Sequence, residues 1–350
     1  MDVVIHAGMP KTGTTSLQSA LAANRLALGR QGVLVPDLNV QNLLGVITRD
    51  FADLPRPLRH RLATQEELET ARSEAMEVLQ GLLHGGGERL VLSSEYIYGA
   101  DAAGLARLGA ALKGATRITC LFYVRSAASF YMAGLQQRAR ASGELLTPAA
   151  FLEDTVPSDF RYHPLAFVES CGKALTERLE VCCYDRELFE QGDIRRDFWQ
   201  RAGLDEAMLG DGETPHENRA LAAEEVKLLL EYRRRHHPRR LDDVLIPHST
   251  MLMDSLPGRG TPVVLQGGLA AWIDNARRGE IEALRDRFRI VFRDVDYDFP
   301  GGSDAWKSRD LKIEDIITVD AERFTALSMA LIHAMLSDRL RRLQDGAQKA

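Results

Sequence analysis

Five short apolar runs, each bounded by polar residues, Gly or Pro, lie within the first 185 residues and are typical of buried β-strands. They cover residues 3–5, 32–36, 89–95, 116–124 and 178–185. Elsewhere apolar residues recur every three or four positions, which predicts helices at 65–83, 103–112, 147–153, 164–175, 218–237, 269–288 and 321–343. This alternation favours an α/β three-layer sandwich with a mostly parallel central sheet of about five strands and helical C-terminal additions.

The first strand leads into a turn rich in Gly and Pro at residues 8–13, and a helical pattern follows directly. A loop that feeds a helix N-terminus gathers unpaired backbone N–H groups and the positive end of the helix dipole, so it attracts anions such as phosphate. The hydroxyl groups of Thr12, Thr14, Thr15 and Ser16 add donors, and Lys11 adds a positive charge. The stretch therefore predicts a phosphate cradle. The alternative is a polar turn that caps a helix and binds nothing.

The position of the lysine separates this loop from the P-loop of ATP-binding proteins. In the form G-x-x-x-x-G-K-[ST] the lysine follows the second glycine, whereas here Thr14 follows Gly13 and Lys11 stands directly after Pro10. The run Pro-Lys-Thr-Gly-Thr-Thr-Ser after an apolar strand resembles the 5′-phosphosulfate loop of sulfotransferases that use 3′-phosphoadenosine 5′-phosphosulfate (PAPS), most closely the bacterial carbohydrate-type members. The resemblance extends over roughly residues 1–230 and implies a fold like that of the P-loop nucleoside triphosphate hydrolases.

By this resemblance, the lysine contacts the transferring sulfonate and the bridging oxygen, while the following amides and hydroxyls hold the 5′-phosphate. The residues of this loop that it implies in donor binding are Pro10, Lys11, Thr12, Gly13, Thr14, Thr15 and Ser16. Sulfonate transfer in this family needs no metal, so we expect none here.

The run at 89–95 ends in polar groups, as does a buried parallel strand that delivers side chains to a site at its C-terminal end. In the sulfotransferases that this chain resembles, a strand here presents the general base, a glutamate in carbohydrate members. Glu95 is therefore the candidate base. The alternative is a structural role at a helix start, with Ser93 or Ser94 as the cap and Glu95 favouring the helix dipole.

The longest strand signal, 116–124, ends at Arg125. In the resembling family, a strand that ends in arginine and a serine two helical turns later contact the 3′-phosphate of PAPS. Arg125 matches the arginine, but Ala133 stands at the serine position, and Ser129 is the hydroxyl one turn earlier on the same face. Because one hydrogen bond to a charged phosphate contributes about 1.5–3 kcal/mol, we expect weaker but not abolished donor binding.

The composition is that of a soluble globular protein and argues against some functions. A net charge of −6 argues against a general nucleic-acid binder, and 45% hydrophobic with 27% charged residues is ordinary for a soluble globular protein. No secretion signal or membrane-spanning stretch is evident, so we expect a soluble cytoplasmic protein. The four cysteines suit buried free thiols, and none has metal-ligand spacing with a histidine, so we expect no structural zinc.

We expect a sulfotransferase-like α/β domain over residues 1–300 and a linker with an amphipathic helix over 301–350, packing on the core or on a partner. Residues 37–63, with two prolines, are predicted to be an irregular insertion or lid. The stretch 257–262 reads as a flexible basic loop, and because sulfotransferases often close such a loop over the 3′-phosphate, Arg259 is a further candidate ligand. The acceptor and the oligomeric state, including self-association as a homo-oligomer, stay open.

The function that the resemblance implies is transfer of a sulfonate group from PAPS to a hydroxyl or amine of a small-molecule or glycan acceptor, with a carbohydrate favoured. A kinase-like phosphotransferase would need the lysine after Gly13 and a strand ending in aspartate for Mg²⁺, and neither stands out. A non-catalytic nucleotide-binding or assembly protein with a degenerate donor pocket is the other alternative, which Ala133 makes conceivable.

Overall fold

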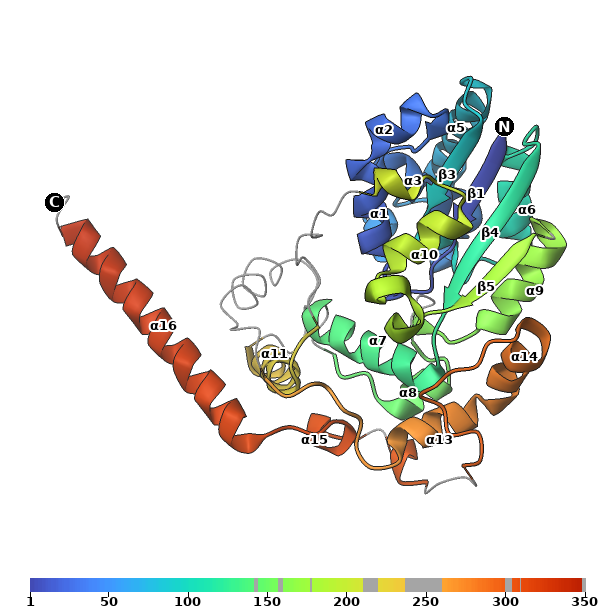
Figure 1. Cartoon of the computed structure of the whole chain (residues 1–350). Coiled ribbons are helices and arrows are strands. Elements are labelled where there is room, and N and C mark those ends of the chain that lie inside the picture. The colour runs from blue at the N-terminus through green and yellow to red at the C-terminus, as the bar shows by residue number, and fades with distance from the viewer. Residues whose placement is uncertain are drawn as a thin grey trace. The chain divides into compact units, whose positions relative to one another are not determined.

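The computed structural model describes residues 1–141, 144–156, 160–176, 178–209, 220–236, 260–299, 304–308 and 310–347. Its centre is a five-stranded sheet in which every neighbouring pair is parallel and the strand order is β2-β3-β1-β4-β5 (Figure 1). The strands are β1 (Asp2–His6), β2 (Val33–Leu34), β3 (Arg89–Ser93), β4 (Arg117–Val124) and β5 (Leu179–Cys183). The predicted α/β fold is confirmed, and the strand that leads into the Gly-rich loop lies at the centre of the sheet.

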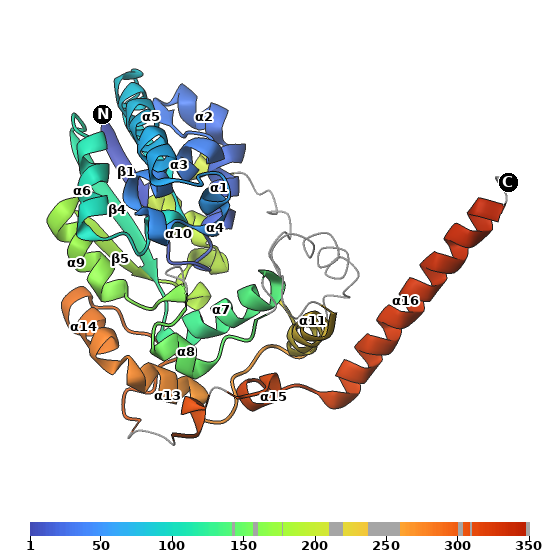
Figure 2. The same ribbon diagram turned by 180° about the vertical axis from the view of Figure 1, so that it is seen from behind.

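Helices cover both faces of the sheet (Figures 1 and 2). One face packs against α1 (Thr14–Ala23), α2 (Arg25–Arg30) and α10 (Ile194–Arg201), whose apolar side chains form one core cluster with alternate residues of the strands. Side chains of a strand alternate between faces, so Tyr123 of β4 lies in that cluster while its neighbour Phe122 contacts Phe167 on the other face, 4.7 Å between ring centres. The predicted core residues Phe198 and Trp199 are fully buried.

Other helices cover the opposite face. They are α3 (Leu38–Thr48), α5 (Gln65–His84), α6 (Ala102–Ala111) and α9 (Pro164–Ala174), which contact one another in sequence order along the sheet. A complete capping box begins α5, because Thr64 accepts from the Glu67 amide while the Glu67 carboxylate accepts from the Thr64 amide. The short helix α4 (Arg56–Arg59) follows α3.

Contacts divide the chain into two compact units. The first consists of Met1–Phe130, Glu153–Pro215 and Asp274–Phe299, and the second of Tyr131–Leu152, His216–Ile273 and Pro300–Ala350. The first holds the sheet and α14 (Arg278–Phe288), while α7 (Ala127–Ala141) and α13 (Leu269–Ala276) each have residues in both units. The second holds α8 (Pro148–Leu152), α11 (Ala223–His236), α15 (Ile313–Ile316) and α16 (Ala321–Ala347).

Two predicted elements were wrong in detail. Residues 37–63 are not irregular, because α3 covers eleven of them and α4 a further four. The predicted helix at 269–288 is two helices, α13 and α14, separated at Arg277. Asp274, Asn275 and Gly279, poor helix formers, lie around that break.

All four cysteines are free thiols, as predicted, with Cys120, Cys171 and Cys182 buried and Cys183 half-buried. In the part of the chain that the structure describes, no helix combines the length and apolar character needed to cross a bilayer.

Candidate functional site

The β1–α1 loop, residues 7–13, is a tight turn fastened by Thr12. The buried Thr12 donates to the carbonyl of Met9 twice, from its amide at 3.2 Å and from its hydroxyl at 2.7 Å. Lys11 and Gly13 on either side have left-handed backbones, with φ of 66° and 80°. Glycine tolerates that conformation, but for lysine it costs about 1–3 kcal/mol, and such strain clusters at functional sites.

The start of α1 presents a row of open donors. Gly13 occupies the N-cap and offers no side chain, and among the described residues the amides of Thr14, Thr15 and Ser16 have no acceptor. The hydroxyl of Thr14 is buried and also has no hydrogen-bond partner in the described chain. Because the helix dipole adds a partial positive charge at the same place, these groups suit an anion with several oxygen atoms.

Gly8 leaves space for this arrangement. A Cβ atom on Gly8 would lie 2.5 Å from the Thr14 hydroxyl and 3.0 Å from Cε1 of His6. Real Cβ atoms do not approach so closely, so a side chain here would push apart the loop and the first turn of α1. The cradle fits a phosphate or phosphosulfate group in its donors and in its backbone.

His6, the last residue of β1 before the loop, carries no predicted role. It is fully buried, its Nδ1 lies 2.8 Å from the Ser93 hydroxyl, and its Nε2 has no partner among the described residues. Burial lowers the pKa of His6 to about 3, so the ring is neutral near pH 7. Since the side-chain amide of Gln18 (Nε2) also donates to the Ser93 carbonyl at 3.0 Å, β1 and α1 are both fastened to the end of β3. The sequence signal for His6 is its place as a polar residue at the end of an otherwise apolar strand.

Glu95 follows β3 at the edge of the sheet where the loop begins. His6 and Ser93 are paired in register, so Glu95 comes two residues after the partner of the last β1 residue. It begins a 3₁₀ turn, Glu95–Ile97, whose cap is Ser94, which accepts from the Tyr96 amide at 3.2 Å. Glu95 is half-buried. Both interpretations made from the sequence are therefore compatible with its place: a helix-start carboxylate and a base beside the loop.

Arg125 follows β4 at the same edge. Its guanidinium carbon lies 4.6 Å from the centre of the Tyr184 ring, and its Nε has no hydrogen-bond partner in the described residues. A Cβ atom on Gly13 would lie 3.3 Å from Cε2 of the same ring. The Tyr184 ring therefore lies against Arg125 and also borders the loop at Gly13. Burial lowers the pKa of Arg125, although an arginine remains charged at any physiological pH.

The N-terminus of α7, next to Arg125, is already capped by acidic side chains. Ser126 donates to the Asp294 carboxylate at 2.6 Å and accepts from the Ser129 amide at 3.2 Å. Asp274 accepts from the Ala128 amide at 2.8 Å, and burial raises its pKa to about 7. The first amides of α7 and the Ser126 hydroxyl are thus engaged, which leaves the Arg125 side chain as the donor for a second anionic group.

The other predicted residues fall into three kinds. Pro10 is buried, Ser16 and Ser129 are half-buried, and Thr15 is exposed. Arg259 lies outside the described residues. Within the described ranges no three His, Cys, Asp or Glu side chains are close enough to hold a metal ion.

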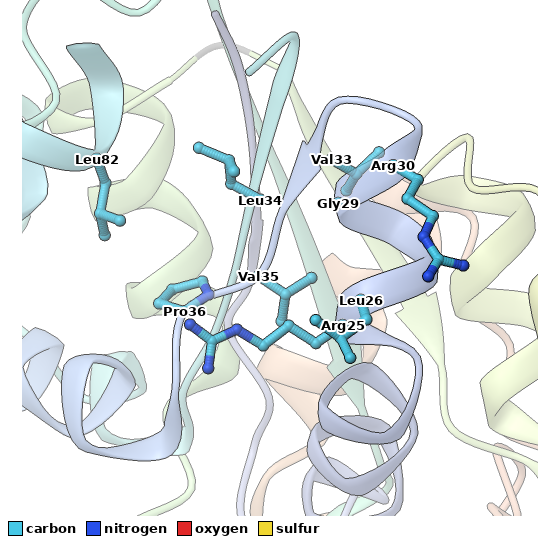
Figure 3. Close-up of a pocket in the computed structure, with 9 residues that line it drawn as sticks. All are labelled: Arg25, Leu26, Gly29, Arg30, Val33, Leu34, Val35, Pro36 and Leu82. Atoms are coloured by element: carbon cyan, nitrogen blue, oxygen red, sulfur yellow. The ribbon is translucent and has the colours of Figure 1, made fainter. Parts of the chain in front are cut away.

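A pocket of about 390 Å³ lies elsewhere, at the β2 edge of the sheet (Figure 3). Residues of α2, β2 and the segment after it line it, together with Leu82 of α5, and Arg25 and Arg30 contribute the charged groups. None of the predicted site residues that the structure describes lines this pocket.

Comparison with solved structures gives remote similarity. The chain is similar in structure to a sulfotransferase from Alicyclobacillus acidocaldarius, with 16% sequence identity and a TM-score of 0.39, over 65% of this chain and 91% of that chain. Similarity at this level is too remote to indicate an activity. No protein-family model matches the chain, and no curated protein matches it.

Proposed function

We propose that this protein transfers a sulfonate group from PAPS to a hydroxyl or amine of an acceptor, with a carbohydrate as the favoured class. The observation that carries the proposal is the β1–α1 loop. Among the described residues, three amides at the head of α1 have no acceptor and the buried Thr14 hydroxyl has no partner, and Lys11 has a strained backbone conformation. Such a set of donors binds a phosphate-type anion. The place of the lysine, before rather than after Gly13, is the feature shared with the PAPS loop.

In the proposed reaction the acceptor oxygen or nitrogen forms a bond to sulfur while the bond from sulfur to the 5′-phosphate oxygen breaks. Glu95 takes the acceptor proton, and adenosine 3′,5′-bisphosphate leaves. Lys11 and the amides of α1 stabilise the charge that develops on the leaving phosphate, a type of preorganised interaction typically worth about a hundred- to a thousand-fold in rate. Arg125 would hold the 3′-phosphate, and Tyr184 would support its guanidinium.

One observation favours a second candidate, a nucleotide-binding protein without transferase activity. Asp274 accepts from the Ala128 amide and Asp294 accepts from the Ser126 hydroxyl, so a 3′-phosphate at this end of α7 would find these donors already engaged. Such a protein would bind the 5′-side of a nucleotide in the loop and discriminate poorly between 3′-phosphorylated and unmodified forms.

Calorimetry and isotope transfer separate these candidates. The purified protein is titrated with adenosine 3′,5′-bisphosphate, AMP and ATP with Mg²⁺, and is then incubated with ³⁵S-labelled PAPS and candidate glycans with and without EDTA. We expect the bisphosphate to bind more tightly than AMP, label transfer that EDTA leaves unchanged, and a loss of about a hundred- to a thousand-fold in turnover for Lys11→Ala.

Lys113→Ala is the matched control, because Lys113 is exposed and follows α6, outside the loop. Equal affinity for the bisphosphate and AMP without label transfer would favour the second candidate. No binding of any of these nucleotides at millimolar concentration would contradict both.

A further inference from the structure

A buried arginine binds the backbone of the turn that begins with the candidate base, Glu95. Arg49, the residue after α3, is 2% exposed. Its guanidinium donates to three backbone carbonyls: Nε to Tyr96 at 2.9 Å, Nη1 to Gly99 at 2.9 Å, and Nη2 to Tyr98. All three acceptors belong to residues 95–99, which we call the Glu95 turn. Burying a charged group is unfavourable unless its hydrogen bonds are supplied, so the guanidinium requires this turn in its present conformation.

Two glycines make the approach possible. Gly99 has a left-handed backbone, with φ of 77°, and a Cβ atom there would lie 3.0 Å from Nη1 of Arg49. A Cβ atom on Gly45, in the middle of α3, would lie 3.0 Å from Cβ of Tyr96. The Glu95 turn therefore packs closely against α3 at Gly45 and against the Arg49 guanidinium at Gly99.

The turn is also held from its other side. The hydroxyl of Tyr98 donates to the Arg161 carbonyl at 2.9 Å and accepts from the His163 amide at 3.0 Å. The Tyr98 ring stacks on Phe122 of β4, with 5.9 Å between ring centres and an interplanar angle of 17°. The Arg49 hydrogen bonds to the backbone of the turn act together with these contacts of the Tyr98 side chain.

The position of Arg49 is itself secured at the end of α3, where the last carbonyls of a helix lack intrahelical donors. Arg72, also buried, donates from Nη2 to the Arg49 carbonyl at 2.9 Å and from Nε to the Val46 carbonyl at 3.2 Å. Nε of Arg107 donates to the Ile47 carbonyl at 2.9 Å. These hydrogen bonds hold the backbone at the C-terminus of α3, from which the Arg49 side chain extends.

From this geometry we propose that Arg49 is a positioning residue for Glu95: by holding the carbonyls of the Glu95 turn, it sets the direction in which the Glu95 carboxylate faces the acceptor. The inference rests on the proposed function, because it assigns Glu95 the role of base. A base must lie within hydrogen-bond reach of the proton that it removes, and a displacement of about 1 Å can cost on the order of a hundred-fold in rate. Segment 37–63 then contributes to the site through Arg49, which holds the turn that carries the base.

The test compares Arg49→Lys with Arg89→Lys and Glu95→Gln in the full chain. Arg89, at the start of β3, is the control: this half-buried arginine donates from Nη1 to the carbonyls of Ala202 and Gly203, and Gly203 has φ of 62°. Lysine keeps the charge in both variants but cannot supply the fork of donors. The rate of ³⁵S transfer from PAPS, or of ³⁵S-sulfate release to water, is measured together with the affinity for adenosine 3′,5′-bisphosphate.

We expect Arg49→Lys to lower the rate about a hundred-fold while the affinity for the bisphosphate changes less than about twofold. The double variant Arg49→Lys, Glu95→Gln is expected to be no slower than Glu95→Gln alone, because a positioning residue has nothing to position once the base is gone. Arg89→Lys is expected to lower thermal stability without a comparable loss of rate.

A second measurement does not depend on activity. Hydrogen exchange of the free protein is expected to be faster in residues 95–99 of Arg49→Lys than in the wild type, and unchanged in residues 8–16. If Arg49→Lys does not fold, Arg72→Lys is measured instead. This variant weakens the hydrogen bonds to the end of α3 and leaves those from Arg49 to the Glu95 turn in place. It is expected to change the transfer rate and the hydrogen exchange of residues 95–99 in the same direction, at about a tenth of the size.

The outcomes separate the inference from the proposed function. A wild-type chain that neither binds the bisphosphate nor releases sulfate from PAPS contradicts both. A fully active Glu95→Gln contradicts the role of Glu95 as the base, and the inference with it, but not sulfonate transfer. If wild type is active and Glu95→Gln is not, then an Arg49→Lys that retains its rate, or that multiplies the Glu95→Gln defect, overturns the inference alone.

Discussion

The guanidinium carbon of Arg125 lies 4.6 Å from the centre of the Tyr184 ring, and the same ring borders Gly13 at the head of α1. Two segments that are more than a hundred residues apart in sequence thus meet at one aromatic side chain. A cation over an aromatic face is stabilised by about 0.5–2 kcal/mol without any hydrogen bond. The arginine is therefore held in place while its Nε stays without an acceptor among the described residues.

Arg125→Lys is expected to weaken binding of adenosine 3′,5′-bisphosphate about ten- to a hundred-fold, because lysine cannot stack on the ring or present a planar set of donors to a phosphate. Binding of AMP, which lacks the 3′-phosphate, is expected to change little. Calorimetry with both nucleotides measures the difference. Arg117→Lys, at the exposed start of the same strand, is the control. Equal losses for the two nucleotides would contradict the assignment of Arg125 to the 3′-phosphate.

Gly8→Ala is expected to lower the free energy of unfolding by about 1–3 kcal/mol and to abolish nucleotide binding, because its methyl group would lie 2.5 Å from the Thr14 hydroxyl. Removing that hydroxyl relieves the shortest contact, so the double variant Gly8→Ala, Thr14→Ala is expected to recover part of the stability. Urea denaturation measures both. Gly81→Ala, where no atom lies within 4 Å of the added carbon, should instead be neutral or stabilising. A Gly8→Ala protein with normal stability would show that the loop is not tightly packed.

The sequence predicted the sheet and the loop well because both leave local signals. Apolar β-branched runs mark strands that are buried on both faces, and the Gly-rich turn before a helical pattern marks the cradle. All five runs are strands, and β1 delivers the loop at the centre of the sheet. The residues that follow the strands, Glu95 and Arg125 among them, could then be placed at one edge because parallel strands share a direction.

The supports of the site could not be predicted, because their partners are distant in sequence. Arg49 is 47 to 50 residues from the carbonyls that it binds, and nothing nearby distinguishes it from the exposed arginines of the same segment. Helix α3 was missed since Asn, Val and Gly weaken its intrinsic preference, and the helix depends on packing against the Glu95 turn through Gly45. The contact of Tyr184 with Arg125 is likewise tertiary.

His6→Phe is expected to reduce the loss of folding stability that accompanies a fall in pH. Burial lowers the folded-state pKa of His6 to about 3 from an ordinary 6.5, so between these values the unfolded chain binds the proton and the folded chain does not. His6 therefore makes stability fall as the pH drops from about 6.5 towards 3. Phenylalanine keeps the ring but loses the Ser93 contact, so the variant should be about 1 kcal/mol less stable at pH 7 and lose less on acidification. Urea denaturation at pH 7, 6, 5 and 4 gives the two slopes, and parallel slopes would contradict a buried neutral histidine.

Asp274→Asn should act in the opposite sense. Burial raises the folded-state pKa of Asp274 to about 7 from an ordinary 3.8, so the folded chain keeps a proton that the unfolded chain releases, and this contribution to stability is lost as the pH rises from about 4 through 7. Asparagine resembles the protonated form and can still accept from the Ala128 amide. We therefore expect the variant to match the wild type near pH 4 and to exceed it at pH 8, by up to about 4 kcal/mol. Asp310→Asn, at an exposed carboxylate, is the control and should leave the profile unchanged. An Asp274→Asn protein that is less stable than the wild type at pH 8 would mean that the ionised carboxylate is needed at the start of α7.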